Sequence, residues 1–214
     1  MRVTRQTGFT LVEIAIVLVI VGLLLGGILK GQEMIVQSKI KNAMADFSGI
    51  SAAYAGYQDR YRAIPGDDPN TSTRWSGSTA GNGNGIVAGL YNSQTQTDES
   101  RLWWDHLRRA GFVAGNGTHQ PGNALTGILG VQTGDGKGKT VLGGFSSLII
   151  CSANIPDKVA IALDTSMDDG LMLSGAVRGQ LQNIPNPAIA PSFGLASGAY
   201  SETGAHTYVL CRQV

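Results

Sequence analysis

The chain of 214 residues is poor in charge, cysteine and histidine, and each shortage excludes a class of protein. Charged residues make up 14% of the chain and the formal net charge is +1, so no large basic surface suits nucleic acid or anionic lipid. Two cysteines are too few for a structural zinc site, which usually takes four Cys or His ligands. The histidines, His106, His119 and His206, have no metal-like spacing. We therefore expect neither a metal nor a cofactor.

Several segments resemble catalytic or binding motifs without completing them. Residues 134–140 lack one glycine of a phosphate-binding loop, and residues 83–88 match the dinucleotide pattern without a βαβ context. Leu148 stands where a nucleophile turn requires glycine. The pairs Asp67-Asp68 and Asp168-Asp169 do not fit the alternating acids of a calcium loop. We expect no catalytic residue and no enzymatic activity.

One long apolar run stands near the N-terminus. Residues 9–29 form an apolar run of 21 residues interrupted by a single charge, Glu13. As a helix this run spans the roughly 30 Å hydrocarbon layer of a membrane. A secretory signal peptide is the alternative, since Arg2 and Arg5 precede the run, but the run is long for one and no small-x-small site ends it. An ordinary anchor leaves Glu13 unexplained, because a central acid costs about 3 kcal/mol on insertion, and less near the end.

The residues around this acid resemble the processing motif of type IV prepilins. The match consists of a short basic leader, Gly8, Phe9, Glu13 and the apolar run that follows. In that family a membrane peptidase cuts after the glycine and methylates the new N-terminal amine. The resemblance therefore implies cleavage between Gly8 and Phe9, and N-methylation of Phe9. Glu13 takes the place of the family's glutamate, which neutralises the terminal amine of a neighbouring subunit in the growing filament.

A charge pair of this kind would set the register of assembly. A buried ammonium and a buried carboxylate are each costly alone, and much less so when they are paired and hydrogen-bonded. Only the correct axial stagger would hide both charges, so we interpret Glu13 as the registry residue. Loss of Arg2 and Arg5 with the leader would change the formal charge from +1 to −1, so we expect no direct nucleic-acid binding from charge.

Helical periodicity continues past the apolar run. Apolar residues recur on one stripe between residues 40 and 61, and Pro65 should end the helix by Ile64. A helix from Phe9 to Tyr61 has 53 residues, or about 80 Å if straight. No proline occurs in residues 1–64, so a glycine cluster is our candidate for the partly melted segment that the resemblance implies within a filament. The stripe contains Ile40, Met44, Phe47, Ile50, Tyr54, Tyr57 and Tyr61, and the cluster contains Gly22, Gly26, Gly27 and Gly31.

Beyond the helix, polar loops alternate with short elements. Residues 65–97 are predicted to be an irregular surface loop, and residues 111–144 a second Gly-rich stretch. A short helix is predicted over residues 98–110, with Trp103, Leu107 and Ala110 on one face. For the pair Trp103-Trp104 we favour core packing over a ligand platform. Further predicted elements are a strand over 145–152, a helix over 157–164 and a terminal strand around 208–211.

Cys151 and Cys211 both lie in the C-terminal third. In an exported domain two thiols would more naturally pair, and the pilin resemblance implies a head closed by this disulfide. The predicted fold class is α+β: a long N-terminal helix, membrane-spanning in its first half and amphipathic in its second, packed on a small antiparallel sheet with long loops. The expected divisions are a leader at 1–8, a membrane and assembly half at 9–36, an amphipathic half at 37–64 and a head at 65–214.

Three functions remain open. The first is a type IV pilus subunit, major or minor, for adhesion, twitching motility or DNA uptake, which the late cysteines and the long head favour. The second is a pseudopilin of a type II secretion system, and the third is a membrane-tethered enzyme or binding protein. Expected partners are further copies and related pilins, the prepilin peptidase, the inner-membrane assembly platform and lipid. The subunit would sit in the bacterial inner membrane with its head in the periplasm, then join an extracellular pilus.

Overall fold

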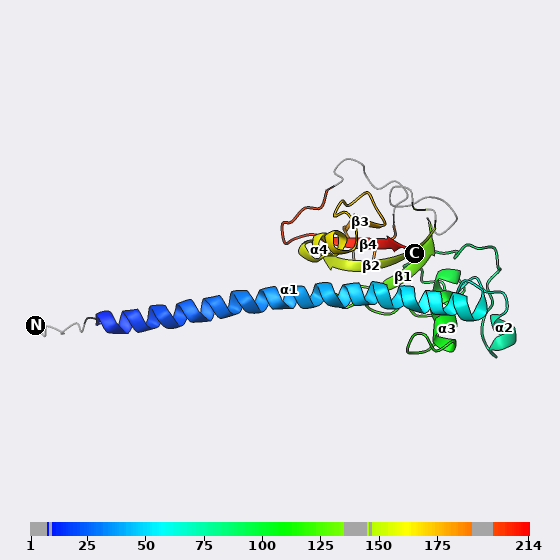
Figure 1. The fold of residues 1–214 in the computed structure, drawn as a ribbon, viewed down its shortest axis with the longest axis horizontal. Helices are drawn as coiled ribbons and strands as arrows, with labels where there is room; N and C mark the ends of the chain where they lie inside the picture. The colour runs from blue at the N-terminus through cyan, green and yellow to red at the C-terminus, as the bar shows by residue number, and fades with distance from the viewer. Residues whose placement is uncertain (1–7, 9, 135–144, 146, 190–198) are drawn as a thin grey trace, which may run out of the picture. The chain divides into compact units, whose positions relative to one another are not determined.

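The computed structural model describes residues 8, 10–134, 145, 147–189 and 199–214. The chain divides into two compact units, Met1–Ser38 and Lys39–Val214. One continuous helix, α1 (Leu11–Tyr61), has residues in both units (Figure 1). Its 51 residues confirm the predicted single long helix, which ends at Tyr61 before Pro65.

The first unit consists of the apolar half of α1. This helix is long and apolar enough to cross a membrane, and none of its most apolar stretch is buried within the protein. Leu11 is 87% exposed and Leu23 is 74% exposed, as suits side chains that face lipid or other subunits. The four glycines of the cluster lie within unbroken helix, and a Cβ added at any of them would meet no atom within 4 Å. Melting of this segment in a filament therefore remains a prediction.

The second half of α1 buries the predicted stripe in the core of the other unit. Ile40, Phe47, Ile50 and Tyr57 are buried, which confirms the amphipathic pattern. The remaining stripe residues, Met44, Tyr54 and Tyr61, are half-buried.

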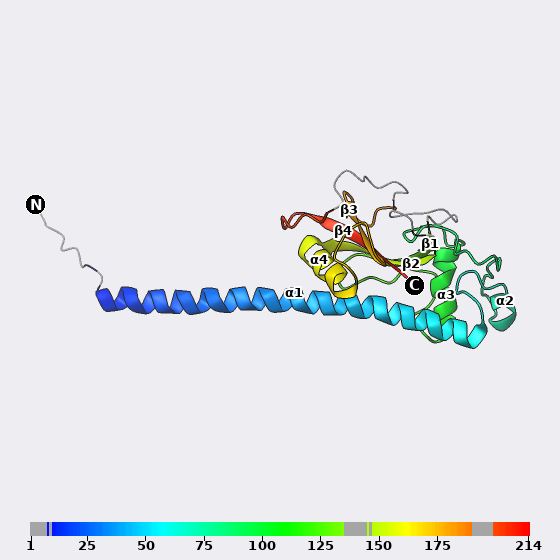
Figure 2. The ribbon, with the colours of Figure 1, turned by 45° about the horizontal axis from the view of Figure 1, so that its top comes forward.

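A four-stranded antiparallel sheet has the order β1-β2-β4-β3. Helix α4 directly follows β2 and packs on the strands (Figure 2). This small sheet with its C-terminal disulfide confirms the predicted α+β class. The bounds are β1 Leu129–Thr133, β2 Leu148–Pro156, α4 Asp157–Met167, β3 Val177–Gln182 and β4 Thr207–Gln213.

The strands of the sheet were only partly predicted. β4 lies where the terminal strand was expected, and α4 begins where predicted but runs three residues further. The strand predicted over 145–152 is wrong in its bounds, because β2 starts at Leu148 and continues through an irregularity at Asn154, whose φ is +58°. β1 lies inside the stretch predicted to be a Gly-rich loop. Gly130 within it serves packing, since a Cβ there would lie 2.1 Å from the carbonyl oxygen of Tyr91.

The prediction of an irregular surface loop over residues 65–97 holds for most of the segment, which is exposed or half-buried, but residues 65–68, Thr71, Val87 and Tyr91 are buried. The segment contains a short helix, α2 (Thr71–Arg74), and buried acids hold several of its backbone amides. Asp67 accepts hydrogen bonds from the amides of Asn84 (3.0 Å) and Gly85 (2.8 Å). Glu99 accepts from the amides of Asn82 (3.1 Å) and Ala88 (2.9 Å). These bonds replace the water that a surface loop would use.

Two further buried groups hold the same segment. Asp68 is wholly buried, accepts a hydrogen bond from the Tyr57 hydroxyl (2.7 Å) and pairs with Arg74. The buried His106 ring accepts a hydrogen bond from the Gly66 amide at Nδ1 (2.8 Å) and lies 2.9 Å from the Thr79 carbonyl oxygen at Nε2. This arrangement requires the neutral tautomer that carries its proton on Nε2. Burial lowers the pKa of His106 accordingly.

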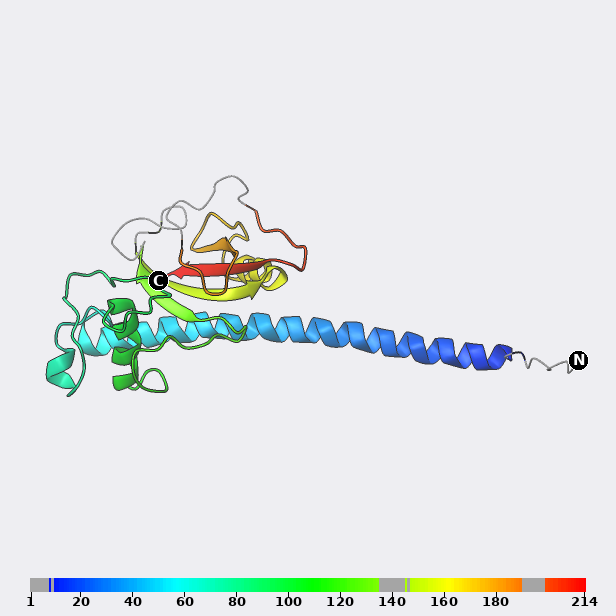
Figure 3. The same ribbon diagram turned by 180° about the vertical axis from the view of Figure 1, so that it is seen from behind.

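Helix α3 (Glu99–Arg109) confirms the helix predicted over 98–110. It lies beside the C-terminal end of α1, as the view from behind also shows (Figure 3). Trp103 and Leu107 are fully buried as predicted, but Trp104 is fully buried as well, so the helix packs on more than one face. The two indole rings meet edge to face with centroids 4.9 Å apart. Core packing of the tryptophan pair is thus confirmed.

Candidate functional site

The candidate assembly site lies at the N-terminal end of α1, where Thr10 and Glu13 form a capping box. The Glu13 carboxylate oxygen Oε2 accepts hydrogen bonds from the Thr10 amide (2.7 Å) and the Thr10 hydroxyl (2.8 Å). In return, the Glu13 amide donates to the Thr10 hydroxyl oxygen at 3.3 Å. A helix start leaves its first amides without intrahelical partners, and this reciprocal arrangement satisfies two such donors.

Both bonds from Thr10 end on the same carboxylate oxygen. Among the residues that the structure describes, the other oxygen of Glu13, Oε1, accepts no hydrogen bond. A carboxylate has about four lone-pair positions, so Glu13 keeps acceptor capacity for a donor from outside the chain. The Glu13 side chain is exposed, and so are the apolar side chains around it on α1. The arrangement can therefore bind a cation or a strong donor without breaking the cap.

The cap would survive the predicted processing, because the amide of Thr10 belongs to the peptide bond between residues 9 and 10. Gly8 is exposed, as a cleavage site requires, while Phe9 and its predicted methylation lie outside the described residues. Glu13 was predicted to be the assembly residue, whereas no role was predicted for Thr10. The signal was available, since threonine followed three positions later by glutamate ahead of an apolar run is the signature of a capping box.

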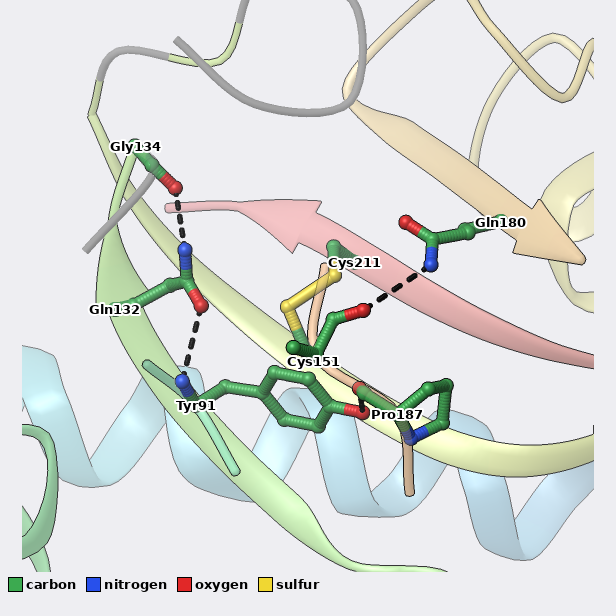
Figure 4. The surroundings of a disulfide bond; sticks show 8 residues. Tyr91, Gln132, Gly134, Cys151, Gln180, Pro187 and Cys211 are labelled. Atoms are coloured by element: carbon green, nitrogen blue, oxygen red, sulfur yellow. Dashed lines mark hydrogen bonds between the residues drawn. A yellow bond between two sulfur atoms is a disulfide. The ribbon is translucent and has the colours of Figure 1, made fainter. Parts of the chain in front are cut away.

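The predicted disulfide between Cys151 and Cys211 is present. The two residues face each other across the β2 and β4 ladder, with Cα atoms 4.0 Å apart, and both are wholly buried. Figure 4 shows the bond beside the ring of Tyr91, whose hydroxyl donates to the Pro187 carbonyl oxygen at 2.6 Å. Burial raises the pKa of this hydroxyl. The disulfide thus crosslinks β2 and β4, and Tyr91, from before β1, packs beside it while bonding Pro187, from after β3.

The side chains of Gln132 and Gln180 lie on either side of the disulfide and Tyr91 (Figure 4). Gln132 accepts a hydrogen bond from the Tyr91 amide (2.9 Å) and donates to the Gly134 carbonyl oxygen (2.7 Å). On the other side Gln180 donates to the Ala188 carbonyl oxygen at 3.2 Å (Figure 4). Buried backbone groups near the disulfide are therefore paired, as the interior of a stable domain requires.

Three carboxylates gather at the C-terminal end of α4 and just beyond it. Asp164, Asp168 and Asp169 have ligand oxygens within 4.8 Å of one another. Each already accepts donors that shape the following turn: the Tyr200 hydroxyl on Asp164, the Val177 amide on Asp168 and the Ser174 hydroxyl on Asp169. Burial raises the pKa of Asp164, whereas the bond from Ser174 lowers the pKa of Asp169. Asp168 and Asp169 thus act as acceptors within the turn that follows α4.

An open groove of about 660 Å³ is formed mainly by amide, proline and aliphatic residues, including Asn154, Gln182 and Ile184. Lys39 is the one charged residue among the described residues that line it, and none of these is a histidine, a cysteine or an acid. The described lining therefore contains no Ser-His or Cys-His pair and no cluster of acids.

The comparison with known proteins agrees with the N-terminal geometry. A model of the prokaryotic N-terminal methylation motif matches residues 3–29, a stretch that holds Gly8, Phe9, Thr10 and Glu13. No curated protein matches the chain. The motif and the exposed apolar helix fit a membrane-anchored protein. This motif is the hallmark of type IV pilins and pseudopilins, which are structural proteins, and it marks the chain as pilin-like.

Proposed function

We propose that this protein is a structural subunit of a type IV pilus, major or minor, that serves adhesion, twitching motility or DNA uptake. Prepilin peptidase cuts the chain between Gly8 and Phe9 and methylates the amine of Phe9. The assembly platform of the inner membrane then polymerises the subunit through α1. The role is mechanical and not enzymatic, and the methylation motif supports it.

The single observation that carries the proposal is the carboxylate of Glu13 at the start of an exposed apolar helix. Its oxygen Oε2 is held by Thr10 and its oxygen Oε1 points to no partner among the described residues. The methylated ammonium of a neighbouring Phe9 is a donor of the required charge and size. Pairing the two groups hides both charges, whereas losing one member of a buried pair costs about 3–5 kcal/mol.

Before assembly, the apolar half of α1 is embedded in lipid of the inner membrane, with the head in the periplasm. The buried disulfide supports an oxidising compartment for the head, because such bonds persist outside the cytoplasm. After assembly the head lies on an extracellular filament made of further copies and related pilins. The late disulfide and the long head favour a pilus over a secretion pseudopilus, and the charge gives no reason to expect direct nucleic-acid binding.

The test compares two glutamates of the same helix. Glu13→Ala should abolish or severely reduce filaments, because each added subunit would leave one ammonium buried without its partner. Glu33→Ala is the matched control, since Glu33 is exposed on α1 and, among the described residues, pairs only with Lys30 (2.7 Å). Electron microscopy of sheared surface fractions measures filaments, and immunoblots of membranes measure the subunit. Glu13→Gln should assemble poorly because it keeps an acceptor but not the charge.

Processing is read in the same samples. Intact mass should show that the wild type and both alanine variants begin at methylated Phe9, with the subunit stable in the membrane. A mature chain that starts after residue 20 would indicate an ordinary signal peptide and refute the proposed function. Normal filament yield from Glu13→Ala would show that Glu13 is not the registry residue.

A further inference from the structure

Three asparagines of the head are followed by glycine, at residues 82–83, 84–85 and 116–117. This dipeptide can rearrange without an enzyme. The glycine nitrogen attacks the side-chain carbonyl carbon of asparagine, ammonia leaves, and a five-membered imide forms. Water then opens the imide at either carbonyl carbon and yields aspartate or isoaspartate. Glycine favours the attack because it has no Cβ to hinder it. We propose that, in the folded chain, Asn116 is the residue converted in this way.

The first two dipeptides are protected by their hydrogen bonds. The nitrogen that must attack is the amide of Gly83 or Gly85, and each donates to Asp67. Gly83 bonds the carbonyl oxygen of Asp67 (2.8 Å), and Gly85 bonds the buried carboxylate (2.8 Å). A hydrogen bond to a charged, buried acceptor is among the stronger ones in proteins, and it must open before the nitrogen can react.

The carbonyl groups under attack are held as well. The side-chain oxygen of Asn82 accepts the amide of Asn84 at 3.0 Å, and that of Asn84 accepts the amide of Ile86 at 2.9 Å. The Asn82 amide is tied to the buried Glu99 at 3.1 Å. Rotating either side chain toward the following nitrogen would therefore break one of these hydrogen bonds.

The third dipeptide lacks these restraints. Asn116 and Gly117 are both exposed. Among the described residues, neither the side chain of Asn116, nor its carbonyl oxygen, nor the amide of Gly117 has a hydrogen-bond partner. The peptide group between them can therefore turn without losing any bond, which is the motion that ring closure needs.

The flanks of this dipeptide are fixed, so the reaction would alter a defined contact. Arg108 Nη1 donates to the carbonyl oxygens of Gly117 and His119, both at 2.7 Å, and Arg101 donates to that of Thr118 at 2.6 Å. Aspartate at position 116 would add a negative charge next to this cation. Isoaspartate would also lengthen the backbone by one carbon and shift the carbonyl oxygens that Arg108 holds.

The experiment follows the full chain in detergent during incubation in mildly alkaline buffer. Trypsin separates the sites, because peptide 110–137 contains Asn116 and peptide 75–101 contains Asn82 and Asn84. Mass spectrometry locates the mass increase that replacing an amide by a carboxylate produces. Asn116 should be modified at least about tenfold faster than Asn82 and Asn84. Those two can react only when their loop opens locally, whereas Asn116 needs no such opening. In urea the three sites should react at similar rates.

Asp67→Ala provides an internal control. It removes the carboxylate that holds Gly85 but keeps the backbone oxygen that holds Gly83, so Asn84 should react faster while Asn82 stays protected. If this variant does not fold, the rates at the three asparagines in folded and urea-unfolded wild type still test the proposal. Equal rates at the three sites of the folded chain would overturn the inference. So would an Asn116 that stays intact while the unfolded chain is fully converted.

Discussion

Reduction of the disulfide should cost the head about 4 kcal/mol of unfolding free energy. Cys151 and Cys211 are 60 residues apart in sequence, and the chain-entropy model gives roughly this value for a loop of that size at 25 °C. The bond closes a segment that includes α4 and β3, so its loss frees a large part of the unfolded head. The double variant Cys151→Ala, Cys211→Ala should lose at least as much, because both side chains are wholly buried and their removal also leaves space.

Urea unfolding of the full chain in detergent measures this loss. The three tryptophans, Trp75, Trp103 and Trp104, all belong to the unit Lys39–Val214, so their fluorescence reports on the head. With a typical slope of about 2 kcal/mol per molar urea, the midpoint should fall by about 2 M. Free energies must be compared as well as midpoints, since a reduced chain exposes more surface on unfolding and its slope can rise.

Two outcomes would refute this reasoning. A loss below about 1 kcal/mol would mean that the reduced, unfolded chain stays as constrained as the crosslinked one, contrary to the entropy model. Rapid reduction of the native chain by a mild thiol would contradict the burial of both sulfurs, because exchange needs direct access to a sulfur atom. Reduction that begins only as urea unfolds the head is the expected course.

Two further perturbations address the cap and the buried imidazole. Thr10→Val removes one of the two donors to Glu13 and should cost the helix about 1 kcal/mol of stability. Filament yield in electron micrographs should therefore fall, but by less than in Glu13→Ala. Thr10→Ser keeps the hydroxyl and should restore the yield. Burial lowers the pKa of His106 below its ordinary value of 6.5, so the unfolded chain binds a proton that the folded chain rejects. Its contribution to stability should be complete above pH 6.5 and decline as the pH falls below it. Urea titrations of His106→Gln at several pH values should show a weaker decline than wild type, and an identical decline would contradict the assignment.

The N-terminal half of the fold was predictable because its signals are local. The apolar run, the stripe from Ile40 to Tyr61 and the stop before Pro65 all lie within neighbouring turns of one helix. The assembly residue Glu13 was identifiable for the same reason, since the motif around it is contiguous. Helix α3 was also found nearly to the residue, because Asp98 begins it and Gly111, with φ of +82°, ends it.

The strands could not be predicted with the same precision because tertiary contacts decide them. β1 is five residues long and all five are buried, so no alternation marks it in sequence. Half of the six residues of β3 are polar, and the segment becomes a strand through its pairing with β4. β2 runs past its expected end because the register shift between Ser152 and Ile155 lets its pairing with β4 continue. Within this shift, the side chain of Asn154 accepts a hydrogen bond from Gln182 at the end of β3. Partners so distant in the chain leave no local pattern.

The segment over residues 65–97 shows why composition alone missed the buried groups that hold a surface loop. Asparagine, glycine and aspartate are common in loops because they satisfy backbone groups in tight turns, and water can do the same for an exposed loop. Here the acceptors are protein groups, and they come from far along the chain. Glu99 is 17 residues from the amide of Asn82 that it binds, and His106 is 40 residues from Gly66. A loop held by buried acceptors and one held by water thus have the same composition. The difference lies in α3, whose polar residues Glu99 and His106 face inward and not toward solvent. A helix with buried polar residues on several faces therefore indicates that a neighbouring loop supplies their partners.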